Sequence, residues 1–106
     1  MITPDQWMIL KIKGDTPHYK IFASWRGGYL GSDSWRMNSG ITDVEEDDDF
    51  YMFKGKSGSV YRCNKQAYGI STAYNASVMK NFEDISNGLI EIINDMPDIM
   101  NMDWII

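Results

Sequence analysis

The sequence has a single cysteine, Cys63, and a single histidine, His18. One thiol excludes an intramolecular disulfide and is typical of a protein from a reducing compartment. A structural zinc site would need carboxylates for most of its ligands, which is an uncommon composition. Cys63 lies in a strand pattern with nothing nearby to activate its thiol, and His18 fits the polar face of a hairpin. We therefore expect no metal, no cofactor and no enzymatic activity.

Long hydrophobic runs are also missing. No stretch reaches the roughly 18 consecutive apolar residues that indicate a transmembrane helix, and the first twenty residues carry five charges and no signal-peptide core. A chain of 106 residues that is 43% hydrophobic fits one domain with one core. We expect a soluble, cytoplasmic, unprocessed domain spanning residues 1–106, with no membrane association.

Charges of one sign are absent from long segments. Residues 43–49 and 82–106 each hold six acids and no base, whereas residues 50–81 hold five bases and no acid. The net charge of −5 disfavours direct nucleic-acid binding, because an acidic surface repels phosphates. An acidic surface attracts basic partners, although it can also serve only to keep a small protein soluble.

The acidic run is the first candidate site. It consists of Asp43, Glu45, Glu46, Asp47, Asp48 and Asp49. It lacks the alternating ligands, central glycine and terminal glutamate of a calcium loop, and strands flank it where helices are needed. Adjacent acids on an exposed turn also lack the apolar pocket of a glycosidase. The run is either a solvated hairpin tip or an acidic surface that binds a basic partner.

The first two thirds of the chain alternate in polarity with the period of β-strands. Residues 6–13 and 18–25 predict a hairpin, because Gly14, Asp15 and Pro17 between them favour a turn. Further strands are expected at 35–37, 41–46, 50–55 and 59–64, with turns at 38–40, 47–48 and 56–58. This spacing favours an antiparallel meander sheet of about five or six strands, which can curl into a partial barrel.

The period changes after Ser71. Seven apolar residues recur at spacings of three and four, as on one face of a helix: Val78, Met79, Phe82, Ile85, Leu89, Ile92 and Ile93. Ser71 or Thr72 can cap its start, Pro97 ends it, and residues 87–88 mark a point where it can break. The predicted fold class is therefore α+β, with the sheet followed by a long C-terminal helix and a short apolar tail.

The second candidate site is the segment WRGGYLGSDSWR, residues 25–36. Its aromatic and guanidinium groups are typical of binding surfaces and can stack a nucleotide. They belong to Trp25, Arg26, Tyr29, Trp35 and Arg36. No phosphate-binding glycine motif follows a strand here. In the alternative interpretation, both tryptophans are core residues at strand ends and the glycines only bend the chain.

The third candidate is the tail, residues 99–106. It holds six large apolar side chains, those of Ile99, Met100, Met102, Trp104, Ile105 and Ile106. Such a density is rarely left in water. We expect it to add a strand to a sheet edge, either within one chain or between two chains as a homodimer. A tail that stays free would instead be a partner site.

Three stretches carry a resemblance. The segments WMILKI, HYKIFASWRGGYLGSDSWRMNSGI and FYMFKGKSGSVYRCNKQAYG, within residues 6–69, resemble small uncharacterised accessory proteins of T4-like tailed bacteriophages. The resemblance implies a protein of the bacterial cytoplasm, from a class in which short acidic proteins bind and disable host or defence machinery. It implies no chemistry and leaves the helical third unmatched.

Our leading hypothesis is a binding protein that inhibits or modulates a host or defence protein with a basic surface. Its basis is the two acidic segments and the missing catalytic set. The alternatives are a small-ligand or nucleotide binder that uses residues 25–36, and a structural homo-oligomer held by the tail.

Overall fold

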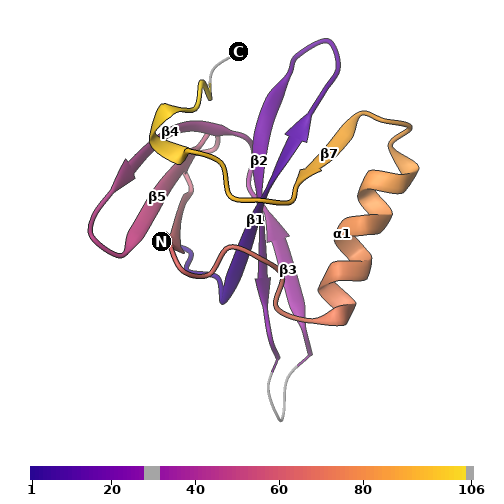
Figure 1. Ribbon diagram of the computed structural model, residues 1–106, viewed down its shortest axis with the longest axis horizontal. Coiled ribbons are helices and arrows are strands. Elements are labelled where there is room, and N and C mark those ends of the chain that lie inside the picture. The colour runs from indigo at the N-terminus through magenta and orange to yellow at the C-terminus, as the bar shows by residue number, and fades with distance from the viewer. Residues whose placement is uncertain (28–31, 105–106) are drawn as a thin grey trace.

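The structure is a computed structural model that describes residues 1–27 and 32–104. Within these residues, seven strands, one α-helix and one 3-10 turn follow in chain order: β1 (Gln6–Ile12), β2 (His18–Trp25), β3 (Ser34–Met37), β4 (Ile41–Glu46), β5 (Phe50–Gly55), β6 (Val60–Asn64), α1 (Ala73–Ile85), β7 (Ile90–Ile93) and η1 (Ile99–Asn101). The first sheet has the order β3-β2-β1-β7 and the second sheet the order β4-β5-β6, and all neighbouring strands are antiparallel. The α+β class is confirmed (Figure 1).

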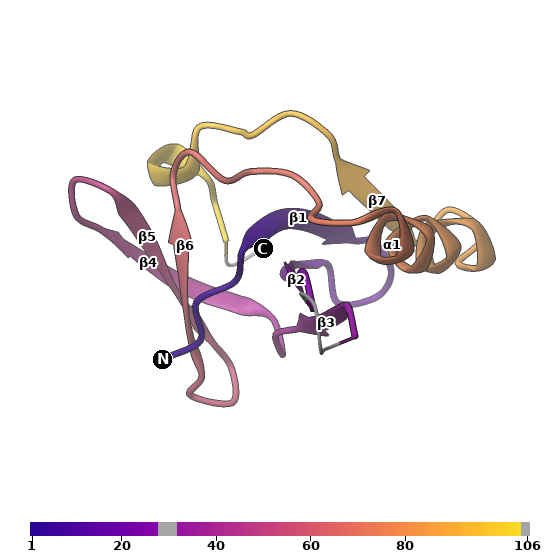
Figure 2. The same cartoon turned by 90° about the horizontal axis from the view of Figure 1, so that it is seen from below.

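The elements form three layers, with the first sheet between α1 and the second sheet (Figure 2). The reason lies in β1, which is apolar on both faces. Trp7 and Ile9 face the second sheet, while Met8 and Leu10 face α1, and none of the four is more than 6% exposed. Because side chains alternate along a strand, burying all four requires a cover on each side of the sheet.

Trp7 is the centre of the core between the two sheets. Its ring lies 5.4 Å from the ring of Phe53 and 4.8 Å from that of Tyr68, measured between centroids. The indole nitrogen donates a hydrogen bond to the carbonyl of Asn64 at 2.7 Å. The sheets are therefore joined by aromatic packing and by a buried polar group that has its partner.

The predicted hairpins are present, but the strands do not form one meander. The chain leaves the first sheet after β3 and starts the second sheet at β4. Gly40 supports this departure with a φ of 130°, a region that favours glycine. Asn38 fixes it from within, because its Oδ1 accepts a hydrogen bond from the buried backbone N–H of Ile21 at 2.9 Å. The described strands thus make two open sheets and close no barrel.

The helix begins as predicted and ends much earlier. Thr72 caps it, with its hydroxyl accepting from the N–H of Asn75 at 3.1 Å. It ends at Ile85, far before Pro97, because Asn87 and Gly88 adopt left-handed φ values of 54° and 86°. Neither helical segment in residues 1–27 and 32–104 combines the length and apolar character that crossing a membrane requires.

The residues after this break form a strand where we expected helix. β7 pairs with β1 at the edge of the first sheet, with Leu10 opposite Ile92. Glu83 ties α1 to this strand, since one carboxylate oxygen accepts from the N–H of Ile92 at 2.9 Å and the other lies 2.8 Å from Lys80 Nζ. The hydrogen bond from Ile92, and then that from Lys80, lower the pKa of Glu83.

This contact predicts a pH dependence of stability. A carboxyl group whose pKa is lower in the folded state contributes stability above its ordinary pKa of 4.5, and this is lost as the pH falls through the folded-state pKa. The free energy of unfolding should therefore decrease on acidification below that value. Urea titrations from about pH 6 to about pH 3 should show a shallower acid dependence for Glu83→Gln. An unchanged dependence would contradict the role of this hydrogen bond.

Candidate functional site

The acidic residues lie on β4 and on its turn into β5, a hairpin at one side of the molecule (Figure 1). All six are exposed: Asp43, Glu45, Glu46, Asp47, Asp48 and Asp49. The predicted turn at residues 47–48 is present between the two strands. The sequence therefore located this surface correctly on a hairpin.

We call Asp47, Asp48 and Asp49 the acidic tip. Asp47 shapes it, because its Oδ1 accepts hydrogen bonds from the N–H groups of Asp49 at 3.0 Å and Phe50 at 2.8 Å. The bond from Phe50, and then that from Asp49, lower the pKa of Asp47. The carbonyl of Asp49 also accepts from the N–H of Lys65 at 2.9 Å. The tip is thus a defined turn held by its own side chain.

Two carboxylates next to the tip are paired with lysines. Glu45 lies 3.0 Å from Lys54 Nζ, and Glu46 lies 2.7 Å from Lys65 Nζ. These lysines come from the base-only segment that follows in the sequence, so the separate charge blocks meet in the fold. In residues 1–27 and 32–104, Asp48 and Asp49 form no ion pair. Next to the two ion pairs, the tip therefore adds carboxylates that no described lysine or arginine neutralises.

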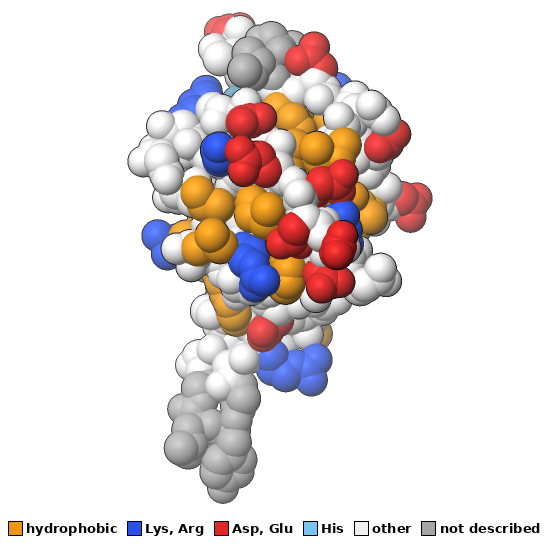
Figure 3. All heavy atoms as spheres, turned by 90° about the vertical axis from the view of Figure 1, so that its left-hand side faces the viewer, with side chains coloured by type: hydrophobic (Ala, Val, Ile, Leu, Met, Phe, Trp, Pro, Cys, Tyr) orange, Lys and Arg blue, Asp and Glu red, His pale blue; other side chains and the backbone are white. Residues whose placement is uncertain are grey.

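The acidic hairpin is part of the second sheet. One face of this sheet is uncovered, and we call it the open face. Strand alternation places these side chains on it: Glu45, Phe50, Met52, Lys54, Val60 and Arg62. The guanidinium of Arg62 lies 3.4 Å from the ring centroid of Phe50. No described helix or strand covers this face in Figure 2, and Figure 3 shows apolar side chains between acidic and basic ones there. An apolar, aromatic and arginine-containing centre beside charges is typical of protein interfaces.

Segment 25–36 does not assemble into one surface in its described part. Trp25 faces the second sheet, whereas Trp35 lies on the other face of the first sheet, stacked on Phe22 at 5.5 Å and edge-on to Phe82 at 5.2 Å. Two rings on opposite faces cannot bind one flat ligand together. Arg36 is exposed on β3, and Tyr29 lies outside the described residues.

The start of this segment is engaged in structural hydrogen bonds. Trp25 Nε1 donates to the carbonyl of Thr3 at 3.0 Å, and the guanidinium of Arg26 donates to the carbonyl of Ser71 at 3.0 Å. The carbonyl of Trp25 accepts from Asn75 Nδ2 at 3.2 Å. Both residues thus fasten the N-terminal segment and the start of α1 to the first sheet.

The tail packs on its own chain through η1 and the residues after it. Ile99 is 1% exposed and Trp104 is 7% exposed, with the Trp104 ring edge-on to Tyr19 and Phe53 at 5.3 and 5.8 Å. Met100 is exposed, while Met102 packs against the core between the sheets. The described tail adds no strand, and the added strand is β7 instead. Ile105 and Ile106 lie outside the described residues.

A cavity of about 170 Å³ lies beside Trp104, where the two sheets meet the tail. Its lining comes from four separate segments: Thr16, Pro17, His18, Ile41, Thr42, Lys56 and Trp104. Sequence reasoning did not single out Lys56 and gave His18 only a place on a hairpin. No local pattern could have found this cavity, because its walls meet only in the folded chain.

The described residues also contain no group of three His, Cys, Asp or Glu side chains arranged to hold a metal ion. Burial raises the pKa of the Cys63 thiol, so this side chain is a core residue of the second sheet. Comparisons with protein-family models, with curated proteins and with solved structures found no match to this chain.

Proposed function

We propose that this protein acts by binding another protein that presents a basic surface, through the acidic tip and the adjoining open face. The observation that carries the proposal is the tip itself, on which Asp47 holds the turn while Asp48 and Asp49 are exposed and form no ion pair with any described residue. Carboxylates on a fixed turn lose little conformational freedom when they bind.

Electrostatics and packing have separate roles in this proposal. The tip attracts a basic partner over a distance and speeds the encounter. The open face then supplies contact area through Phe50, Met52 and Arg62, residue types that are favoured at the centres of interfaces. The neighbouring ion pairs of Glu45 and Glu46 contribute little, because exposed pairs are worth about 0–1 kcal/mol.

The resemblance to accessory proteins of T4-like bacteriophages supports a particular kind of partner. We propose a host or defence protein of the bacterial cytoplasm, whose activity the bound chain inhibits or modulates. The segments that carry the resemblance lie within residues 6–69, and the last of them, residues 50–69, contains most of the open face, whereas the acidic tip lies between two segments. The resemblance therefore concerns the open face rather than the tip itself.

A retention experiment with matched variants tests the proposal. The immobilised protein is exposed to bacterial lysate, and retained proteins are identified by mass spectrometry. We expect one stoichiometric partner on the wild-type protein and far less of it on Asp48→Asn/Asp49→Asn. The control Asp15→Asn/Asp95→Asn removes the same charge from two exposed carboxylates elsewhere and should retain the partner fully. Equal retention by all three proteins would contradict the proposed surface.

A further inference from the structure

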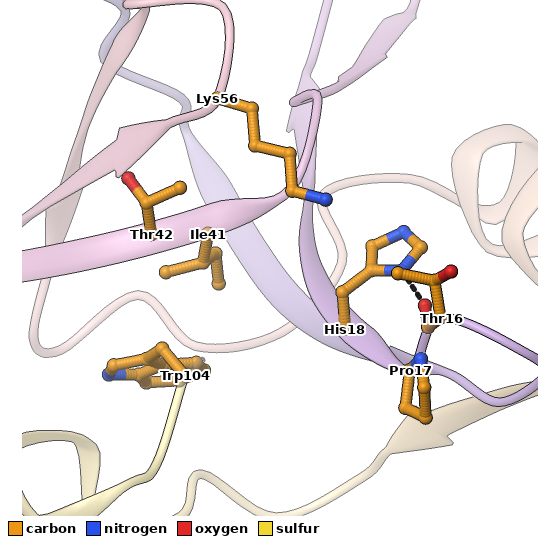
Figure 4. Close-up of a pocket in the computed structure, with 7 residues that line it drawn as sticks. All are labelled: Thr16, Pro17, His18, Ile41, Thr42, Lys56 and Trp104. Atoms are coloured by element: carbon orange, nitrogen blue, oxygen red, sulfur yellow. Dashed lines mark hydrogen bonds between the residues drawn. The ribbon is translucent and has the colours of Figure 1, made fainter. Parts of the chain in front are cut away.

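The cavity beside Trp104 is a composite of the two sheets and the tail. Thr16, Pro17 and His18 come from the turn into β2, Ile41 and Thr42 from the start of β4, and Lys56 from the turn after β5. In Figure 4, Lys56 lies across from Pro17 and Trp104, with His18 beside them. Most of the surface that these residues expose to the cavity is apolar. Among them, Lys56 carries the one ammonium group.

Two polar side chains at the cavity, those of His18 and Lys56, bear on what it could bind. His18 Nδ1 lies 2.8 Å from the carbonyl of Thr16 and must donate to it, since a carbonyl only accepts (Figure 4). The second ring nitrogen, Nε2, has no hydrogen-bond partner among the described residues. Lys56 likewise forms no ion pair within the part of the chain that the structure describes.

Gly40 brings these two groups together. A Cβ built on it would lie 3.4 Å from Cε of Lys56 and 3.5 Å from Cδ2 of His18, so both side chains rest over the bare glycine. Its φ of 130° also disfavours any other residue. The connection between the two sheets at Gly40 thus also allows the side chains of Lys56 and His18 to lie close together.

We propose that this cavity binds a small carboxylate with a flat apolar body. The Lys56 ammonium would pair with the carboxylate, and the His18 ring would form part of the wall beside it. Ile41, Pro17 and Trp104 would cover the body. The volume of about 170 Å³ suits a single ring, since an apolar protein cavity of about 150 Å³ holds benzene. Lys56 is exposed, and one such cation beside an apolar surface matches a singly charged organic anion better than a strongly hydrated phosphate.

Benzoate is the probe for this site. In a titration followed by ¹H–¹⁵N NMR, saturable shifts are expected at the Trp104 indole N–H and at the amides of His18 and Lys56. Lys56→Met should weaken binding about twofold to fivefold, the effect of losing an ion pair with an exposed lysine. The control Lys80→Met removes an exposed lysine of α1, on the other side of the first sheet, and should bind as the wild-type protein does.

Benzamide, which has the same shape without the charge, should bind about twofold to fivefold more weakly. Three results would each overturn the proposal: no saturation with benzoate, equal affinity for benzamide, or unchanged affinity in Lys56→Met. The variant Asp48→Asn/Asp49→Asn should bind benzoate normally, because the acidic tip does not line this cavity.

Discussion

Replacing Trp104 by alanine is expected to lower the free energy of unfolding by about 3–5 kcal/mol, the usual cost of removing a buried tryptophan side chain. Its ring is 7% exposed and packs edge-on against Tyr19 of the first sheet and Phe53 of the second. Through Trp104 the tail therefore contacts both sheets and helps to hold them together. Urea denaturation measures the change directly.

Met100 supplies the matched control for this prediction. It lies in the same tail but is 43% exposed, so Met100→Ala should change stability by no more than about 0.5 kcal/mol. Equal and small effects of the two substitutions would mean that the tail does not pack on its own chain. In that case we would expect the tail to pack on a second copy of the chain. Analytical ultracentrifugation would then show a dimer that dissociates on dilution.

Replacing Tyr68 by phenylalanine is expected to cost at least about 2 kcal/mol, although only one oxygen is removed. That oxygen bridges two strands, accepting from the N–H of Ile9 at 3.1 Å and donating to the carbonyl of Ile93. At this point the segment beside β1 changes. The backbone of Trp7 forms hydrogen bonds with Ala67 and Gly69, whereas β1 pairs with β7 from Ile9 onward.

The cost follows from removing the partner of the N–H of buried Ile9 and of the carbonyl of half-buried Ile93, where an unsatisfied buried group costs about 1–3 kcal/mol. Phenylalanine would keep the edge-on contact with Trp7 at 4.8 Å, so packing changes little. Burial also raises the pKa of Tyr68 to about 12, in keeping with an enclosed hydroxyl. The control Tyr74→Phe alters a tyrosine that is 56% exposed and should be nearly neutral. A cost for Tyr68→Phe as small as that of the control would contradict the bridge.

Most strand positions could be predicted because alternation and turn residues are local signals. The segment 89–93 shows where local signals fail, since its apolar residues fit a helical period and a strand equally. The outcome was decided by the left-handed turn at Asn87 and Gly88 and by the free edge of β1 that accepted Ile90–Ile93. The second of these is a tertiary fact that no window of sequence contains.

The division into two sheets was predictable in principle. Trp7 and Ile9 on one face of β1 and Met8 and Leu10 on the other already indicate a strand that is covered on both sides. A single flat meander with one helix packed on it would leave the other face of β1 exposed. Both faces are covered only if the sheet folds over itself, so that later strands pack on the face opposite the helix. The glycine at position 40 marks where it does so, but a glycine alone does not distinguish a hairpin from a change of sheet.

The candidate sites show the same limit. Exposure of the acidic run followed from its composition, whereas the pairing of Glu45 with Lys54 and of Glu46 with Lys65 depends on strand register. Asp47 also shapes the turn, so replacing it would change the conformation of the tip as well as its charge. For this reason a test of binding should change Asp48 and Asp49 and leave Asp47 in place.

The most direct test of the proposed function is the salt dependence of the association rate with the retained partner. Charges at the rim of an interface act mainly on this rate, and added salt screens them. We predict that Asp48→Asn/Asp49→Asn associates more slowly than the wild-type protein at low salt and with a flatter salt dependence, while Asp15→Asn/Asp95→Asn follows the wild-type protein. An association rate at low salt that is the same with and without the two tip carboxylates would contradict the proposal.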